Sequence, residues 1–256
     1  MIRAVALLEI RALQKQYGTG RAAVFALRGI DLTVEQGEFV SITGPSGSGK
    51  STLMNVLGLL DRPSAGSYRL AGQNMERLAA RALAHERNRR IGFVFQSFFL
   101  LPRLSLMENV ATPLIYRGIP RGQRLARARA TLEAVGIGNL AYRRPTEVSG
   151  GQQQRAAIAR ALVGGPALLL ADEPTGALDT RTGETIMAIF QQLNQNGLTI
   201  LQVTHEPDIA AHGHRIVHLR DGKLHSDQAP EERILADQWL TEHNEADDVE
   251  GERQRA

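Results

Sequence analysis

Gly44-Pro45-Ser46-Gly47-Ser48-Gly49-Lys50-Ser51-Thr52 is the stretch of sequence that decides the fold. It has the pattern of a glycine, four variable residues, a glycine, a lysine and a serine, and it lies between an apolar strand pattern at residues 38–43 and an apolar helix pattern at 51–60. Glycines let a backbone wrap closely around phosphate, and the N–H groups of the loop and of the following helix point at its oxygens. Lys50 would then reach the β- and γ-phosphates, Ser51 would hold Mg²⁺ and Thr52 would meet the α-phosphate. A flexible Gly/Ser linker is the alternative, but the flanking strand and helix favour a nucleotide-binding loop.

A second candidate site element ends an apolar run downstream. Residues 168–171 read Leu-Leu-Leu-Ala and are followed by Asp172 and Glu173. Two carboxylates at the end of a buried strand are costly unless they meet a cation or water. Asp172 is therefore a candidate for holding Mg²⁺ through its outer coordination, and Glu173 for orienting and deprotonating a water molecule in line with the γ-phosphate. A pair of exposed strand-end acids is the plainer alternative.

Strand and helix patterns alternate along most of the chain, which predicts an α/β fold with a parallel sheet covered on both faces. Strands are expected at residues 5–16, 25–34, 38–43, 91–95, 167–171 and 199–204, with a hairpin at 214–225. Helices are expected at 51–60, 121–135, 182–196 and 232–241. Residues 97–150 are predicted to form a mostly helical insertion. In the last helix Leu235 and Trp239 lie one turn apart, and the charged end that follows is predicted to be disordered.

Composition excludes several classes of protein. The 256 residues contain no cysteine, which excludes a disulfide scaffold, a thiolate zinc site and a cysteine nucleophile. No apolar run approaches the roughly 20 residues that span a bilayer, and the first ten residues lack the features of a signal peptide. We therefore expect a soluble protein. Only three of the 30 basic residues are lysines, namely Lys15, Lys50 and Lys223.

Charge is distributed unevenly along the chain. Residues 77–144 hold thirteen arginines against three glutamates, whereas residues 227–256 hold ten acids against three arginines. A nucleic-acid face is one interpretation of the basic segment. Because its arginines fall on polar helical faces without interleaved aromatic residues, a solvated surface is favoured, and no direct nucleic-acid partner is expected.

Val148-Ser149-Gly150-Gly151-Gln152, followed by Gln153-Gln154-Arg155, is the most diagnostic segment. Here the sequence resembles the ATP-binding-cassette (ABC) family, whose signature is Leu-Ser-Gly-Gly-Gln before a helix; this chain departs only at Val148. Ser149 is well suited to cap that helix, and a helix N-terminus binds anions. The resemblance implies a P-loop ABC ATPase with a mixed core sheet, an amino-terminal antiparallel β subdomain and a helical signature subdomain at about 97–150. It implies an ATPase domain at 1–226, and a helix and tail at 227–256.

The same resemblance assigns roles to residues that are weak signals alone. Tyr17 corresponds to the aromatic residue that stacks on adenine, and Gln96 to the glutamine that senses Mg²⁺ and the attacking water. Asp179 lies in the loop that communicates across a dimer, and His205 corresponds to the histidine that contacts the γ-phosphate. Each would more often be structural if it stood alone.

Mechanism and partners follow from the resemblance. It implies ATP and Mg²⁺ as cofactors, and a head-to-tail homodimer in which Ser149 to Gln152 of one chain close over ATP held by the other. It also implies a transmembrane permease with a periplasmic domain (FtsX-like), a periplasmic adaptor as a further candidate partner, and a place on the cytoplasmic face of the bacterial inner membrane. Contacts to the permease are expected near Gln96 and at residues 98–101, for which subdomain core is the alternative.

Within the family, segments such as Phe93-Val94-Phe95-Gln96-Ser97-Phe98 resemble the lipoprotein-releasing (LolD-type) and macrolide-exporter (MacB-type) ATPases. Phe99 stands where that subgroup has a polar residue. Three alternatives stay open: an FtsE-like ATPase that regulates a membrane complex, an ABC ATPase acting on nucleic acid, and a small-molecule kinase. The cargo and the role of the acidic tail are not readable from the sequence.

Overall fold

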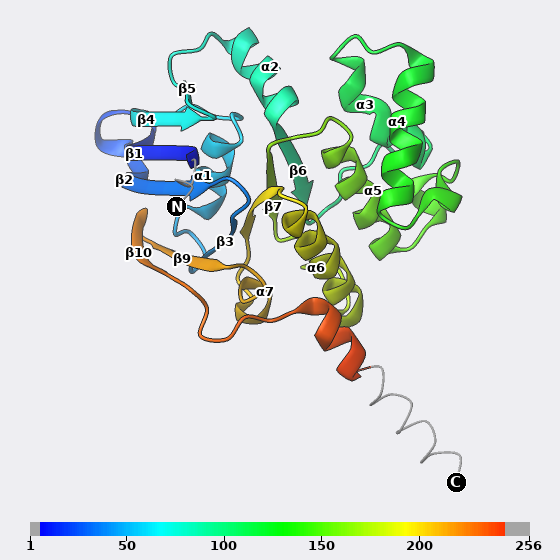
Figure 1. The fold of residues 1–256 in the computed structure, drawn as a ribbon. Helices are drawn as coiled ribbons and strands as arrows, with labels where there is room; N and C mark the ends of the chain where they lie inside the picture. The colour runs from blue at the N-terminus through cyan, green and yellow to red at the C-terminus, as the bar shows by residue number, and fades with distance from the viewer. Residues whose placement is uncertain (1–5, 244–256) are drawn as a thin grey trace, which may run out of the picture.

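The computed structural model describes residues 6–243, which fold around two β-sheets (Figure 1). Its strands are β1 (Ala6–Tyr17), β2 (Val24–Glu35), β3 (Phe39–Thr43), β4 (Ala65–Leu70), β5 (Gln73–Asn74), β6 (Ile91–Phe95), β7 (Leu168–Asp172), β8 (Thr199–Val203), β9 (Arg215–Arg220) and β10 (Lys223–Gln228). One sheet is antiparallel, with the order β2-β1-β4-β5. The other has the order β10-β9-β3-β8-β7-β6 and is parallel except for β10.

Helices cover the six-stranded sheet. They are α1 (Lys50–Leu57), α2 (Ala80–Arg90), α3 (Leu106–Ile115), α4 (Arg121–Ala134), α5 (Gly150–Leu162), α6 (Thr180–Gln195) and α7 (Pro207–Ala210). Short 3-10 turns are η1 (Gly20–Ala22), η2 (Gly138–Leu140) and η3 (Pro145–Glu147), and residues 236–243 are helical. In Figure 1, α3, α4 and α5 gather on the opposite side of the core sheet from the antiparallel sheet.

Alternate residues of the core strands enter two separate hydrophobic cores. On β7, Leu168 and Leu170 pack with the antiparallel sheet and α1, whereas Leu169 and Ala171 pack with α3 to α6. Side chains alternate between the two faces of a strand, so a continuous apolar run is what a sheet buried on both faces requires. The expected mixed core sheet, amino-terminal antiparallel β subdomain and helical subdomain are all confirmed.

The helix predicted at residues 51–60 is shorter than expected. α1 ends at Leu57, and a Cβ on Gly58 would lie 2.5 Å from the ring of Phe93. Leu59 then adopts a left-handed conformation with a φ of 56°, and the N–H of Leu60 donates to the carbonyl of Asn55. Close packing against Phe93 therefore ends the helix where the apolar pattern continues.

The C-terminal helix begins later than the predicted 232–241. The N–H of Ile234 donates to the carbonyl of Ala211, and the N–H of Ala236 donates to Oε1 of Gln191. These tertiary bonds hold the chain extended up to residue 236. Leu235 is exposed and lies before the first helical residue, Ala236, which is buried, so of the expected pair only the half-buried Trp239 lies in the helix. β10 also continues past the boundary expected at 226, and the tail expected to be disordered lies mostly outside the described residues.

Candidate nucleotide-binding site

The predicted phosphate-binding loop connects β3 to α1 and is shaped by its glycines. Gly44, Gly47 and Gly49 have φ values of 147°, 77° and 105°. A Cβ on Gly44 would lie 2.0 Å from the carbonyl oxygen of Leu219, and one on Gly49 would lie 2.6 Å from that of Ala26. Side chains at these two positions would collide with backbone, so the glycines let the loop pack tightly between β2 and β9.

The start of α1 provides a site for an anion. Gly49 occupies the N-cap position, and among residues 6–243 no side chain caps this helix. Its first N–H groups and the positive end of its dipole therefore face the loop. Nζ of Lys50 donates to the carbonyls of Gly44 and Pro45 at 2.7 and 3.0 Å, which places the ammonium group inside the loop. Ser51 is exposed and Thr52 half-buried on the first turn.

Three further candidate residues lie at the same edge of the core sheet. Phe95 is paired with Asp172, and Asp172 with Val203, so β6, β7 and β8 end in register. Gln96 directly follows β6, Glu173 follows β7 and His205 follows β8 by two residues. Carboxyl ends of parallel strands meet at one edge of a sheet, which is where ligands bind in open α/β folds.

Contacts between these residues are specific. Oε1 of Glu173 lies 3.0 Å from Nδ1 of His205. Glu173 has a left-handed backbone with a φ of 47°, and its N–H donates to the carbonyl of Val203. A strained backbone at a non-glycine residue is characteristic of functional sites. The side chain of Gln96 packs on Gly176, where a Cβ would lie 2.8 Å from its amide nitrogen.

Asp172 is an electrostatically unfavourable carboxylate. Burial raises its pKa, the neighbouring Glu173 raises it further, and Lys50 opposes both. A divalent cation would relieve the burial and the repulsion together. The hydroxyl of Ser51, the amide of Gln96 and the carboxylate of Asp172 are oxygen donors of the type that Mg²⁺ prefers, and Mg²⁺ commonly takes its other ligands from water and phosphate. The donor set therefore fits Mg²⁺.

Tyr17 lies at the end of β1, beside the first turn of α1. Tyr17 is 43% exposed, and its hydroxyl donates to Oδ2 of Asp61 at 2.9 Å. Burial and the bond to Asp61 raise its pKa, and a side-chain contact with Thr52 opposes them. Nζ of Lys15 lies 4.9 Å from the ring centroid and 2.6 Å from Oδ1 of Asp61. Lys15 and Asp61 thus hold Tyr17 in place. In the sequence, Lys15 stood out only because lysine is scarce, and nothing there indicated this role.

The signature segment, residues 148–152, forms the start of α5. Oγ of Ser149 accepts from the N–H of Gln152 at 3.3 Å, and Oε1 of Gln152 accepts from the N–H of Ser149 at 3.0 Å. The predicted cap is therefore part of a reciprocal capping box. A Cβ on Gly151 would lie 2.4 Å from Cγ2 of Thr182 on α6, so this glycine permits a close contact between the two helices.

Asp179 caps α6 at that contact. Its carboxylate accepts from the N–H and the hydroxyl of Thr182 at 2.9 and 2.7 Å, and these bonds lower its pKa. The adjoining cavity of about 350 Å³ is lined by Ser149, Gly151 and Gln152 among others, but by no residue of the phosphate-binding loop. No hydrogen bond between described residues joins the two segments either. The signature segment and the phosphate-binding loop therefore lie at separate places on the chain.

Residues of α2, β6, α3 and α5 line a groove on one side of the helical subdomain. It has a volume of about 970 Å³, and its apolar wall includes Phe95, Phe99 and Tyr116. For residues 98–101 the alternatives were contact with a permease and subdomain core. Leu100 packs with the second core, whereas Phe99 and Leu101 are 63% and 48% exposed and so remain available for a partner.

Arg160, which the sequence did not single out, fixes the wall of the groove at Phe99. Its guanidinium donates to the carbonyls of Phe98 and Phe99, both of which have left-handed backbones, and burial lowers its pKa. None of the helices in the described part of the chain is long and apolar enough to cross a bilayer.

The fold and site together define a nucleotide-binding cassette of the P-loop class. The family model "ABC transporter" matches residues 27–176, and the chain belongs to that family. It is 52% identical to the ABC transporter ATP-binding protein YknY of Bacillus subtilis over 218 residues. The aligned region is 85% of this chain and 95% of that protein. It is 49% identical to the macrolide export ATP-binding/permease protein MacB 1/2 of Paracoccus denitrificans, over 87% of this chain and 33% of that protein.

Solved structures agree with this assignment. The ATP-binding cassette MJ0796, in a dimeric post-hydrolysis state bound to ADP and Pi, matches with a TM-score of 0.79 and 41% identity, over 87% of this chain and 98% of that one.

A further relative by sequence, the pyoverdine export ATP-binding/permease protein PvdT of Pseudomonas aeruginosa, is 47% identical over 96% of this chain. The chain spans about a third of the length of these export relatives, 33% and 37%. It is an ABC ATPase cassette.

Proposed function

We propose that the chain binds Mg²⁺-ATP at residues 44–52 and hydrolyses it as a head-to-tail homodimer. The observation that carries the proposal is that the phosphate-binding loop and the signature segment lie apart on one chain. The phosphate-binding loop lies at the edge of the core sheet with Asp172, Glu173 and His205, whereas the capped start of α5 at Ser149 borders a different cavity. A second chain in the opposite orientation would bring its α5 to the open side of the loop. The dimer of the cassette MJ0796 supports this arrangement.

The residues at the sheet edge suit hydrolysis. Backbone N–H groups of the loop, the start of α1 and Lys50 would hold the phosphates, and Tyr17 would lie against the adenine. Glu173 would take a proton from a water molecule that attacks the γ-phosphorus as the bond to the β-phosphate oxygen breaks, and His205, 3.0 Å away, would orient Glu173. Mg²⁺, when bound at Ser51, Gln96 and Asp172, would neutralise charge that develops on the phosphates.

The first test replaces the proposed base. Glu173→Gln is expected to lower the ATP hydrolysis rate by at least about a hundredfold, because general-base catalysis contributes that much, while ATP binding is retained. Phosphate release and fluorescent-ATP binding measure the two effects. Glu206→Gln is the matched control, since Glu206 is exposed nearby and no role is proposed for it. Full turnover in Glu173→Gln would contradict the assignment.

We further propose that the cassette drives a transmembrane permease of the macrolide-export or lipoprotein-release type, on the cytoplasmic face of the inner membrane. The permease-fused relatives support this partner. The groove beside Phe99 and Tyr116 offers it an apolar docking surface. A periplasmic domain on the permease and a periplasmic adaptor would complete the assembly.

Docking can be tested with two exposed tyrosines. Tyr116 lines the groove and is 80% exposed, whereas Tyr142 is 71% exposed and lies outside the groove lining. Tyr116→Ala is expected to weaken co-purification with a co-expressed permease of this type by about tenfold, as loss of an aromatic anchor does, and Tyr142→Ala to leave it unchanged. Basal hydrolysis should be the same in both variants. Equal permease binding by both variants would contradict docking in the groove.

A further inference from the structure

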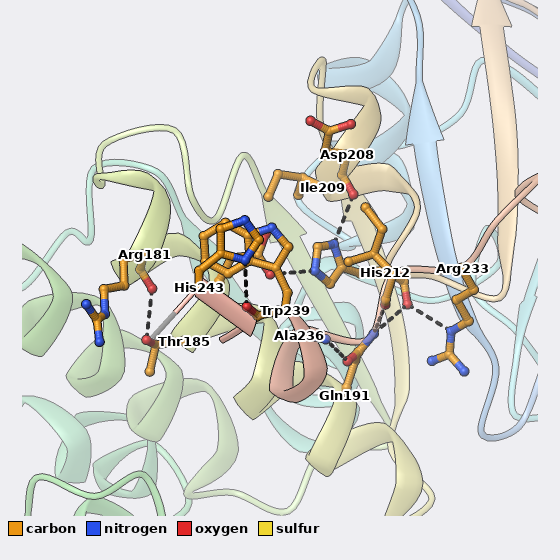
Figure 2. A network of polar contacts seen from close by, with 12 residues as sticks. Arg181, Thr185, Gln191, Asp208, Ile209, His212, Arg233, Ala236, Trp239 and His243 are labelled. Carbon is orange, nitrogen blue, oxygen red and sulfur yellow. Dashed lines mark hydrogen bonds and ion pairs between the residues drawn. The ribbon is translucent and has the colours of Figure 1, made fainter. Parts of the chain in front are cut away.

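A buried pair of titratable side chains joins the two helices that follow Asp179 and His205 in the chain. His212 directly follows the α7 region, and its Nε2 lies 2.9 Å from Oε2 of Glu184 on α6. The two side chains are 0% and 5% exposed. Nδ1 of His212 lies 3.0 Å from the carbonyl oxygen of Asp208, which can only accept, so Nδ1 carries a proton (Figure 2). Removing either partner would leave a buried polar group unsatisfied.

The pair connects elements that begin at two site residues. Asp179 is the N-cap of α6, and Glu184 lies in the next turns of the same helix. His205 comes shortly before α7, and His212 shortly after it. A displacement of α6 would thus be transmitted through the pair to the segment that carries His205.

α7 depends on such side-chain contacts for its position. It has only four residues, too few to be stable by its own hydrogen bonds. Two buried side chains of the core sheet hold its backbone. Oγ of Ser41 on β3 donates to the carbonyl of Ala210 at 2.8 Å, and Nε2 of Gln202 on β8 donates to the carbonyl of Ile209 at 2.9 Å. His212 provides the corresponding contact from the side of α6.

The C-terminal segment closes over this contact. Nε2 of Gln191 donates to the carbonyls of His212 and Ile234 at 3.1 and 2.7 Å, and Nε of Arg233 donates to the carbonyl of His212 at 3.2 Å (Figure 2). The backbone at His212 is therefore held from α6 and from the segment before residue 236. Closely packed interiors transmit displacements from one element to the next, so movement of α6 is expected to reach the backbone at His212.

We propose that His212 and Glu184 are positioning residues for ATP hydrolysis. Their contact makes α6 and α7 move as one unit, so that the loop at Asp179 and the side chain of His205 keep a fixed relation when two chains close on ATP. This inference rests on the proposed function, and it concerns the rate of hydrolysis and not the binding of ATP.

The experiment compares variants that remove the contact with one that restores it. His212→Phe keeps a flat ring and removes both nitrogens, and Glu184→Leu removes the carboxylate. Both are expected to lower kcat by about tenfold or more, because small displacements of catalytic groups have effects of that size, with the Kd for ATP changed less than about twofold. In Glu184→Gln the amide can donate to or accept from Nε2, so kcat should recover most of the loss.

The matched control is Asn194→Leu. Asn194 is also a buried polar residue of α6, but its amide donates to the carbonyls of Gly37 and Leu198 at the other end of the helix. It is expected to lose thermal stability like the pair variants and to keep kcat. If His212→Phe does not fold, His212→Asn replaces it in the same comparison.

Each outcome decides the question. Normal kcat in the pair variants, or an equal loss of kcat in Asn194→Leu, overturns the positioning role while the proposed function stands. Loss of ATP affinity at unchanged kcat overturns it as well. A wild-type chain that hydrolyses no ATP overturns the proposed function, and with it this inference.

Discussion

At the carboxyl end of β7, Asp172 is held ionised at a cost to the fold. Its pKa is raised by burial and by Glu173, so the folded chain binds this proton more tightly than the unfolded chain does. Ionised Asp172 therefore destabilises the nucleotide-free protein at neutral pH. The cost disappears as the pH falls through the raised pKa towards the ordinary carboxyl range of about pH 4.

Asp172→Asn is accordingly expected to raise the Tm of the nucleotide-free chain at pH 7, with a difference from wild type that shrinks near pH 4. The variant should also lose most of the extra stabilisation that Mg²⁺-ATP confers on the wild type, since ligand stabilisation depends on affinity. Calorimetry with and without Mg²⁺-ATP measures both effects. Asp221→Asn is the control, because Asp221 is 86% exposed in the turn between β9 and β10. A lower Tm for nucleotide-free Asp172→Asn would contradict the electrostatic argument.

At the scale of elements, α3 and α5 begin with the same capping motif, but we expect only one of the two motifs to act in ATP hydrolysis. α3 is capped by Ser105 with Glu108, and α5 by Ser149 with Gln152, each in a reciprocal capping box. Replacing the capping serine with alanine costs about 1 kcal/mol of stability in such a motif. Only the cap of α5 belongs to the segment proposed to close over ATP.

Ser105→Ala and Ser149→Ala are therefore expected to lower the free energy of unfolding by similar amounts, about 1 kcal/mol. Ser149→Ala should in addition reduce hydrolysis by about tenfold or more, as loss of one hydrogen-bond donor to a transition state does, and Ser105→Ala should not. Denaturant unfolding and ATPase assays at one temperature separate the two effects. Equal activities in the two variants would show that Ser149 is a cap and nothing more.

At the scale of the whole molecule, the separated half-sites make complementation possible. Lys50→Ala damages the phosphate-binding loop, and Ser149→Arg damages the closing surface. A head-to-tail heterodimer of the two variants would carry one doubly damaged site and one intact site. A single-chain active site would offer no such rescue.

Each variant alone is expected to be inactive, and an equal mixture to recover about a quarter of wild-type hydrolysis, because random pairing makes about half of the dimers mixed. ATPase activity against mixing ratio measures the recovery. A double variant carrying both substitutions on one chain, mixed with wild type at the same ratio, controls for dilution. No recovery in the mixture of single variants would contradict the head-to-tail arrangement.

The buried polar network at α7 shows where sequence reasoning stops. His212, Glu184 and Gln191 carry no motif, and their spacings in the chain of 28 and 21 residues have no periodic meaning. They meet because α6 packs on the face of the sheet that carries Phe39 of β3 and Ile200 of β8. In the same way, Lys15 was noticed for its rarity, but its contact with Asp61 depends on the pairing of β1 with β4.

Local order along the chain determined the class of this protein. The glycines around Lys50 favour a tight phosphate loop, the apolar run before Asp172 favours a doubly buried strand, and Ser149 followed by Gln152 is typical of a helix N-terminus, because each of these signals depends on neighbours within a few residues. Only the tertiary structure decided that β6, β7 and β8 end in register, which brings Gln96, Glu173 and His205 together. It also decided where α1 ends and where the C-terminal helix starts, because packing against Phe93 and the bonds to Gln191 and Ala211 outweigh local helical preference.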